Sequence, residues 1–269
     1  IEIRIRPRAN LIWLDWRALI EYRDLIYLLV RRDFVSKYAQ TILGPAWAVV
    51  TPVVTAFVFA FVFGHVLGVA TDGVPPQLFY LCGLLGWNYF NQTLSATSNT
   101  LRGNYQLFSK VYFPRLAVPL ALSFSNLIAA AIQIVTFAGI FAWAVLANPA
   151  ISARPSWGAL ALPFLFLHLG VLALGGGLLL SAITAKYRDF QHVAPFLLNL
   201  LMYVTPVIYP VSQIPEKWRW VAAINPVSPI IEAFRGALLG TPGFHLGYYA
   251  LSLGVGLYQK LARDFVDYA

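Results

Sequence analysis

The chain has 269 residues, of which 59% are hydrophobic and 11% carry a charged side chain, with a formal net charge of +8 and a mean hydropathy of +0.68. Water-soluble domains are typically about 25% charged, so this composition argues against a soluble enzyme or binding domain and predicts an integral membrane protein. Cys82 is the single cysteine, which excludes an internal disulfide.

Long stretches of the sequence lack Lys, Arg, Asp and Glu, and they predict an all-α integral membrane fold. The uncharged stretches are 38–71, 73–101, 116–153, 155–185, 190–215 and 236–259. Because a helix needs about 20 apolar residues to cross the hydrocarbon core, we predict six transmembrane helices. They lie at about 42–68, 77–98, 116–147, 157–184, 193–210 and 244–258. The sixth is short, at roughly 22 Å of helix, so either this helix is shorter than the others or residues are absent there.

The segment 16–38 precedes the first predicted span and has apolar residues at helical spacing with charges between them. This pattern is typical of an amphipathic helix that lies in the membrane interface and does not cross it. Two interpretations remain open, a membrane-surface anchor and a docking surface for a cytoplasmic partner.

Three further features lie between or within the later spans. The polar loop 98–115 can form a short helix that inserts into a groove of another protein, or it can be an ordinary connector. The run 175–177 consists of three glycines and predicts close packing of the fourth span against another helix.

Segment 211–243 predicts two short helices, one beginning near Pro215 and one ending at Gly240. Their tryptophans suit an interfacial or re-entrant hairpin, in which Glu232 and Arg235 can form an ordinary exposed ion pair.

The distribution of basic residues predicts the orientation. Fifteen of the nineteen Lys and Arg residues lie in the two termini and the loops 98–115 and 184–192, and four lie on the opposite side. The positive-inside rule therefore places both termini in the cytoplasm.

The sequence contains no pattern that predicts catalysis. A nucleotide-binding phosphate loop is absent because no lysine follows a glycine, and the four histidines are scattered, which argues against a metal site. No charged residue lies in the middle of a predicted span, which argues against a proton pump or an ion-coupled transporter. Aromatic residues such as Phe57, Phe61 and Phe90 could line a pore that stacks sugar rings or could contact lipid.

Several motifs in order resemble the ABC-2 type permeases that export polysaccharides. They are Arg31-Arg32-Asp33, Lys37-Tyr38, Leu43-Gly44, Lys110-Val111-Tyr112-Phe113-Pro114-Arg115, Tyr187-Arg188-Asp189, Thr205-Pro206-Val207-Ile208-Tyr209, Asn225-Pro226 and Phe234-Arg235. The similarity extends over about residues 20–269. It implies one ABC-2 transmembrane domain over residues 1–269, in which 16–38 is the interface helix, 98–112 the coupling helix loop and 212–240 the extracytoplasmic gate helices.

The resemblance also implies partners and roles. Two copies of the chain and two separate ATPase subunits would move a lipid-linked polysaccharide, most simply an O-antigen, across the bacterial inner membrane. ATP and Mg²⁺ would bind to the ATPase, with no cofactor, metal or catalytic residue in this chain. The expected ATPase contacts are Arg31, Arg32, Asp33, Leu101, Arg102, Tyr105, Phe108 and Lys110. The expected channel-lining residues are Phe57, Phe61, Phe90, Tyr203 and Tyr209. The expected gate residues are Pro206, Trp218, Glu232 and Arg235.

Two alternatives remain at this point. One is an ABC-2 exporter of a drug or lipid, and the other is a stand-alone membrane channel or enzyme. Arg4, Arg6, Arg8, Arg31 and Arg32 could also attract the pyrophosphate of a lipid-linked substrate, but attraction to anionic lipids is the favoured explanation.

Overall fold

The computed structural model describes residues 16–103, 113–114, 116–149, 151, 153–187, 189–241, 249–250, 252 and 254, and within these ranges the regular structure is entirely helical. The N-terminal half contains α1 (Trp16–Glu21), α2 (Arg23–Tyr38), η1 (Gly44–Ala46), α3 (Trp47–Phe59), η2 (Ala60–Val66), α4 (Pro76–Ser98) and α5 (Thr100–Gly103). The C-terminal half contains α7 (Ala117–Ala147), η3 (Trp157–Ala161), α8 (Leu162–Lys186), α9 (Phe190–Val204), η4 (Val211–Gln213), η5 (Glu216–Trp218), α10 (Arg219–Ile224) and α11 (Ser228–Leu239).

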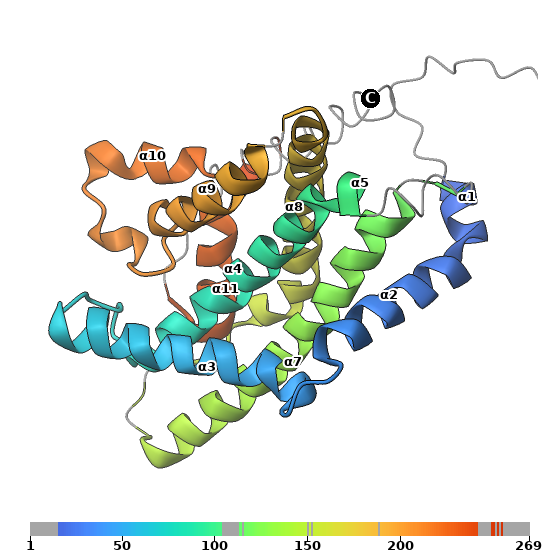
Figure 1. The fold of residues 1–269 in the computed structure, drawn as a ribbon. Coiled ribbons are helices and arrows are strands. Elements are labelled where there is room, and N and C mark those ends of the chain that lie inside the picture. Colours follow the sequence, from blue (N-terminus) through green and yellow to red (C-terminus); the bar gives the residue numbers. More distant parts are fainter. Residues whose placement is uncertain are drawn as a thin grey trace, which may run out of the picture.

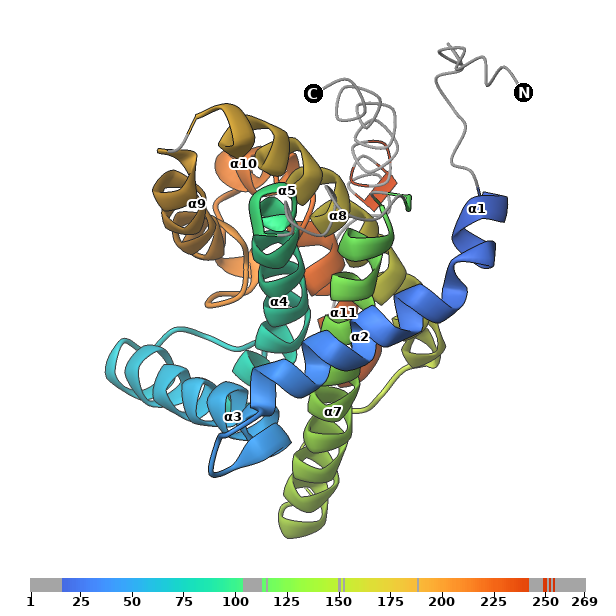
Figure 2. The same ribbon diagram turned by 45° about the vertical axis from the view of Figure 1, so that its right-hand side comes forward.

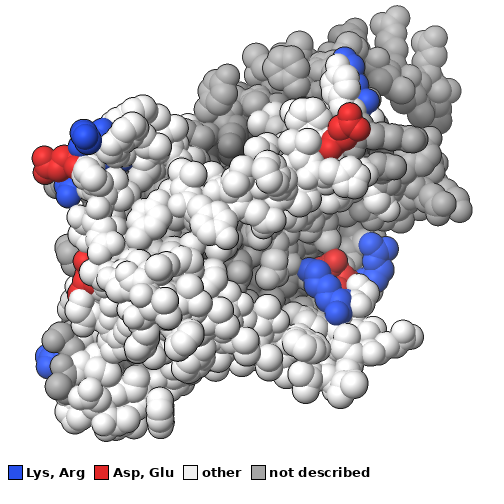
Figure 3. Space-filling view, turned by 60° about the vertical axis from the view of Figure 1, so that its left-hand side comes forward, with Lys and Arg blue, Asp and Glu red and all other residues white. Residues whose placement is uncertain are grey.

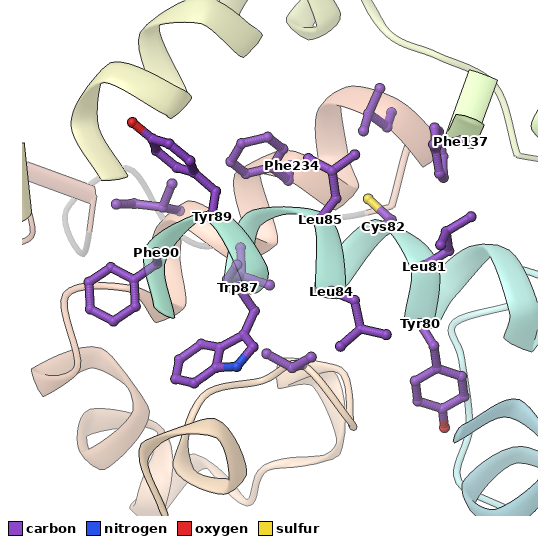
Figure 4. Packing of buried hydrophobic residues seen from close by; sticks show 14 of the residues in the cluster. Tyr80, Leu81, Cys82, Leu84, Leu85, Trp87, Tyr89, Phe90, Phe137 and Phe234 are labelled. Atoms are coloured by element: carbon purple, nitrogen blue, oxygen red, sulfur yellow. The ribbon is translucent and has the colours of Figure 1, made fainter. Parts of the chain in front are cut away.

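Helix α4 lies at the centre, and α3, α7, α8 and α11 pack around it (Figures 1 and 2). Sixteen of its 23 residues are buried. Figure 4 shows its side chains pointing to opposite sides of the helix, with Tyr89 and Leu85 on the side of Phe234 and with Trp87 and Leu84 directed away from it. Because α4 has other helices on several sides, its polar side chains can lie against protein and need not face lipid.

Three helical stretches are long and apolar enough to cross a membrane: Gly44–Val66, Ala117–Ala147 and Trp157–Lys186. They correspond to the first, third and fourth predicted spans. The second predicted span is the 23-residue helix α4, which is less apolar because its second half carries Asn, Gln, Thr and Ser residues. Most of the sixth predicted span, 244–258, lies outside the described residues.

The predicted fifth span, 193–210, is wrong in its bounds. Helix α9 ends at Val204, and Thr205 takes an extended conformation with ψ of 138°. A residue before proline is sterically driven out of the α region, so Pro206 ends the helix at this point. The helix therefore has 15 residues and covers roughly 22 Å.

The glycine run brings α8 close to α4, as predicted. A Cβ on Gly177 would lie 2.6 Å from the Thr97 Cβ and 3.0 Å from the Leu94 carbonyl oxygen. Such contacts are too close for any residue except glycine. The close packing that the sequence predicted for the fourth span is thus confirmed, and its partner is α4.

The amphipathic segment 16–38 forms two helices, α1 and α2, and α2 packs along the first turns of α7 (Figure 2). Leu29 of α2 is buried against Phe113, Ala117, Val118 and Ala121. The opposite face of α2 is exposed and mixes apolar and charged residues. Helix α2 therefore has one face for the helical bundle and one face that is free in this chain.

The two short helices predicted in 211–243 are present as η5 with α10 and as α11. Gly240 ends α11 with φ of +72°, and a Cβ there would lie 2.8 Å from the Arg154 carbonyl oxygen. Ser156 donates its backbone N–H to the Ala237 carbonyl at 3.0 Å, which joins the segment before η3 to α11. Ser212 of η4 donates its hydroxyl to the Asp72 carboxylate at 2.7 Å.

Candidate functional site

A buried arginine holds α11 against α4 and the turn after α9. The Arg235 side chain donates from Nη1 to the Pro206 carbonyl at 2.6 Å and from Nη2 to the Val207 carbonyl at 2.7 Å. Nη1 also contacts the Glu232 carboxylate at 2.7 Å. The Phe79 ring of α4 lies beneath the guanidinium, whose Cζ is 3.7 Å from the ring centroid. We call Phe79, Pro206, Val207, Glu232 and Arg235 the Arg235 cluster.

The cluster depends on a glycine in α4. A Cβ on Gly83 would lie 2.9 Å from the Arg235 Nη2 atom and 3.3 Å from the Val207 carbonyl oxygen. Burying a charged group is costly unless it is paired and hydrogen-bonded. The cluster meets most of this requirement, because one carboxylate, two carbonyls and one aromatic face surround the guanidinium. The Arg235 Nε atom is buried without a hydrogen-bond partner among the described residues.

A second polar contact supports the same turn from the segment between α10 and α11. Asn225 donates from Nδ2 to the Thr205 hydroxyl at 2.7 Å, and its Oδ1 accepts the Val227 backbone N–H at 3.0 Å. Both Thr205 and Asn225 are buried. The side chain of Asn225 thus turns the chain into α11 and ties it to the end of α9.

Three of the four expected gate residues lie together in the Arg235 cluster, namely Pro206, Glu232 and Arg235. Trp218 lies apart in η5 with 55% of its surface exposed. The sequence correctly paired Glu232 with Arg235 but wrongly expected the pair to be exposed. Their side chains are 4% and 1% exposed, respectively, because α4 and the turn after α9 cover them.

The expected ATPase contacts fall into three groups. Arg31 and Arg32 are exposed on α2, whereas Asp33 is half-buried and faces Lys37, 2.7 Å away. Burial and the Asp33 carboxylate raise the pKa of the neighbouring Tyr38 phenol. Leu101 and Arg102 belong to the short helix α5. Tyr105, Phe108 and Lys110 lie outside the described residues.

The expected channel residues divide by exposure. Phe57 and Phe61 are 52% and 65% exposed on α3 and η2, and Tyr203 is 59% exposed on α9. Tyr209 is half-buried and donates its hydroxyl to the Tyr203 carbonyl at 3.0 Å. Phe90 is 4% exposed in the core beside Trp87 (Figure 4), so in this structure it is not on a surface that a substrate can contact.

Exposed apolar side chains continue along both α3 and α9. On α3 and η2 they include Val54, Phe57, Val58, Phe61 and Val62, and on α9 they include Val193, Phe196, Leu197, Leu200, Tyr203 and Val204. Figure 3, in which the left-hand side of Figure 1 is turned forward, shows a face that is largely uncharged in its middle. The Lys, Arg, Asp and Glu side chains lie towards its edges. This face suits contact with lipid, another chain or an uncharged polymer.

A separate groove of about 670 Å³ lies between α7 and α8. Its lining is almost entirely apolar and includes Leu120, Phe124, Leu127 and Leu167. None of the expected channel residues lines it.

The sequence did not single out Asn126 of α7, Thr93 of α4 or the contact between Thr205 and Asn225. Asn126 is the single asparagine of the predicted third span, 116–147. Such polar residues in transmembrane helices commonly hydrogen-bond to neighbouring helices. That signal could have marked the position, although it could not have named the partner. Among the described residues, no group of three or more His, Cys, Asp and Glu could hold a metal ion.

The chain is similar to known proteins over most of its length. Residues 24–239 match the ABC-2 type transporter family. An O-antigen export system permease protein, RfbA of Klebsiella pneumoniae, is 24% identical over 253 residues, which cover 91% of this chain and 94% of that protein. RfbA of Myxococcus xanthus is 26% identical over 81% of this chain and 82% of its own length. The polysialic acid transport protein KpsM of Escherichia coli is 22% identical over 87% and 90%, respectively.

Proposed function

The chain belongs to the ABC-2 type transporter family, and from this premise we propose that it is the transmembrane subunit of an ATP-driven exporter of a lipid-linked polysaccharide. The observation that carries the proposal is the similarity to the RfbA and KpsM proteins, whose names specify O-antigen export and polysialic acid transport, over most of both lengths. O-antigen is the substrate class that we favour, because two of these three relatives are named as O-antigen export permeases.

The energy for transport would come from a separate ATPase chain that binds ATP and Mg²⁺. Nothing in this sequence resembles a phosphate loop. Exposed Arg31 and Arg32 on α2, together with the 98–112 segment, form the expected ATPase contact surface. Movement of the ATPases would shift the first and fifth spans, and the free energy would come from their different affinities for the two states.

The channel would lie between two copies of the chain. The exposed apolar faces of α3 with η2 and of α9 carry Phe57, Phe61 and Tyr203 and have no charged side chain between Lys37 and Asp72 or in 190–215. An aromatic and uncharged lining would let sugar rings slide without tight binding. The Arg235 cluster would hold the hairpin α10–α11, which we place at the extracytoplasmic end of the path.

The topology of this proposal has six spans, with both termini in the cytoplasm and the hairpin α10–α11 re-entering the membrane from outside. Figure 1 supports it, because α1 and α5 lie at the right of the molecule while α10 and the turn after η2 lie at the left. The contact between Ser212 and Asp72 joins two segments that the topology places outside.

Deletion of the gene in its bacterial host tests the function. We expect loss of the surface polysaccharide and accumulation of lipid-linked glycan inside the cell. Expression of this chain with its ATPase is expected to reverse both changes. Normal surface glycan with loss of drug or lipid export would support the other exporter class. Failure to co-purify with an ATPase would point to a stand-alone channel or enzyme.

A further inference from the structure

The contact between α2 and α7 changes from apolar to polar at one level. Along α2 the packed positions are Tyr22, Leu25, Ile26, Leu29 and Val30, and they meet Phe113, Ala117, Val118, Ala121 and Leu122. One turn further along the same stripe of α2 come Asp33 and then Lys37. On α7, the next positions after Leu122 along its stripe are Ser125 and Asn126.

Lys37 contacts each of the other three polar side chains. Lys37 donates from Nζ to the Asn126 Oδ1 atom at 2.7 Å and to the Ser125 hydroxyl at 3.5 Å. Its Nζ also lies 2.7 Å from the Asp33 carboxylate. Because Lys37 and Asp33 are four residues apart on α2, their ion pair sets the direction of the lysine side chain towards α7.

The contact continues to the central helix. Asn126 donates from Nδ2 to the Thr93 hydroxyl of α4 at 3.3 Å. Asn126 and Thr93 are fully buried, at 2% and 0% exposed, in a region of mostly apolar side chains. A line of hydrogen bonds therefore leads from the interface helix through α7 to α4, and we call Lys37, Asn126 and Thr93 the α2–α7–α4 link.

The hydrogen bonds of the link fix the position of α2 along α7, which the apolar contacts between these helices cannot do. Apolar packing resists separation of α2 from α7 but is non-directional, so small residues such as Ala117 and Ala121 allow α2 to slide along α7. Hydrogen bonds require a narrow range of distance and angle, and a single buried Asn can fix the register of two packed helices. The link therefore sets the position of α2 along α7.

We propose that the α2–α7–α4 link transmits movement of α2 to the membrane helices, so that Lys37, Asn126 and Thr93 are positioning residues for coupling ATP hydrolysis to export. The inference rests on the proposed function, in which α2 contacts the ATPase. With the link intact, a push on α2 moves α7 and α4 as well. Without it, α2 follows the ATPase while the rest of the bundle lags behind.

The test measures glycan export and ATP hydrolysis in parallel on the complex of this chain with its ATPase in proteoliposomes. Asn126→Leu removes both hydrogen bonds of the asparagine, Lys37→Met removes the ammonium group, and Thr93→Val breaks only the α7–α4 half. For each variant we expect unchanged co-purification with the ATPase and export per ATP hydrolysed that falls by roughly fivefold or more, which is the usual size of a coupling between sites.

Two matched variants separate positioning from general damage. Lys37→Arg keeps a cation and donors at the same place and is expected to retain most of the export per ATP. Ser36→Ala removes a hydroxyl that bonds to the Asp33 carbonyl within α2 at 2.9 Å and is expected to behave as wild type. The double variant Lys37→Met with Asn126→Leu is expected to lose no more than Asn126→Leu alone, because both substitutions remove the contact between Lys37 and Asn126.

Reactivity of the buried Cys82 towards a maleimide reports whether a variant is folded. If Asn126→Leu unfolds, the near-isosteric Thr93→Val and the half-exposed Lys37→Met decide the question. Folded variants with wild-type export per ATP overturn the inference. Absence of glycan export or of ATPase binding in the wild-type complex would instead overturn the proposed function.

Discussion

Arg235 is fully buried, yet its charge is satisfied by Glu232, two carbonyls and the Phe79 ring. Arg235→Met would leave the Glu232 carboxylate buried without its partner, and breaking a buried pair in this way typically costs about 3–5 kcal/mol. We expect a variant that expresses poorly and unfolds at lower temperature. Unfolding can be followed in detergent by the rate at which a thiol-reactive dye labels Cys82, which is buried in α4 and is the one cysteine of the chain.

The double variant Glu232→Leu with Arg235→Met provides the control. It leaves no unpaired charge, so it is expected to unfold at a temperature between those of Arg235→Met and the wild type. It stays below the wild type because the Pro206 and Val207 carbonyls lose their donor. Equal unfolding temperatures for Arg235→Met and the wild type would show that the pair contributes little.

Individual residues show where sequence reasoning succeeds and where it ends. The spacing of three between Glu232 and Arg235 predicted their pairing, since such residues are neighbours on a helix. Their burial could not be predicted, because it comes from α4 and from the turn after α9, which are distant in sequence. The same holds for Lys37 and Asn126, which lie 89 positions apart and meet because α2 packs along α7.

At the scale of helices, the contact between α4 and α8 depends on Gly177. Gly177→Ala places a Cβ within 3 Å of Thr97, and overpacking of this kind typically costs about 1–3 kcal/mol. Gly139→Ala is the matched control, because Gly139 of α7 has open space around its Cβ position and alanine favours a helix. We expect a lower unfolding temperature for Gly177→Ala alone, measured by Cys82 labelling; similar losses in both variants would contradict the close packing.

The helices themselves were largely predictable, with exceptions that have physical causes. Uncharged runs located the stretches 44–66, 117–147 and 157–186. The second predicted span became the central helix α4, whose polar second half can be accommodated because α7 and α8 surround it. Helix α9 was predicted too long because the predicted span 193–210 continued past Pro206, which ends the helix at Val204.

Helix α2 offers a prediction about partner binding. Arg31 and Arg32 are exposed, so Arg31→Glu with Arg32→Glu is expected to leave the unfolding temperature unchanged while weakening co-purification of the ATPase by roughly tenfold or more, as for charged contacts at interfaces. Arg23→Glu changes an exposed arginine at the other end of α2 and is expected to have little effect. Retained ATPase binding in the double variant would exclude this surface as a contact.

The whole molecule has two ends, and the basic residues indicate which end faces the cytoplasm. The 15-to-4 distribution of Lys and Arg predicts that α2 lies inside and the η5–α10 segment outside, and Figure 1 shows these elements on opposite sides of the bundle. Asp24 on α2 and Lys217 in η5 are both exposed. Each can therefore be replaced by a cysteine that a reagent can reach, and buried Cys82 adds little background.

In intact cells, a membrane-impermeant maleimide is expected to label Lys217→Cys at once and Asp24→Cys only after the inner membrane is permeabilised. The periplasm must be accessible to the reagent, which labelling of a known periplasmic thiol protein confirms in the same cells. The opposite result would invert the topology, move the hairpin α10–α11 to the ATPase side and remove its role at the exit of the path. Labelling of both positions in intact cells would mean that α2 and η5 face the same compartment. That arrangement requires an even number of spans between them, whereas the proposed topology has five.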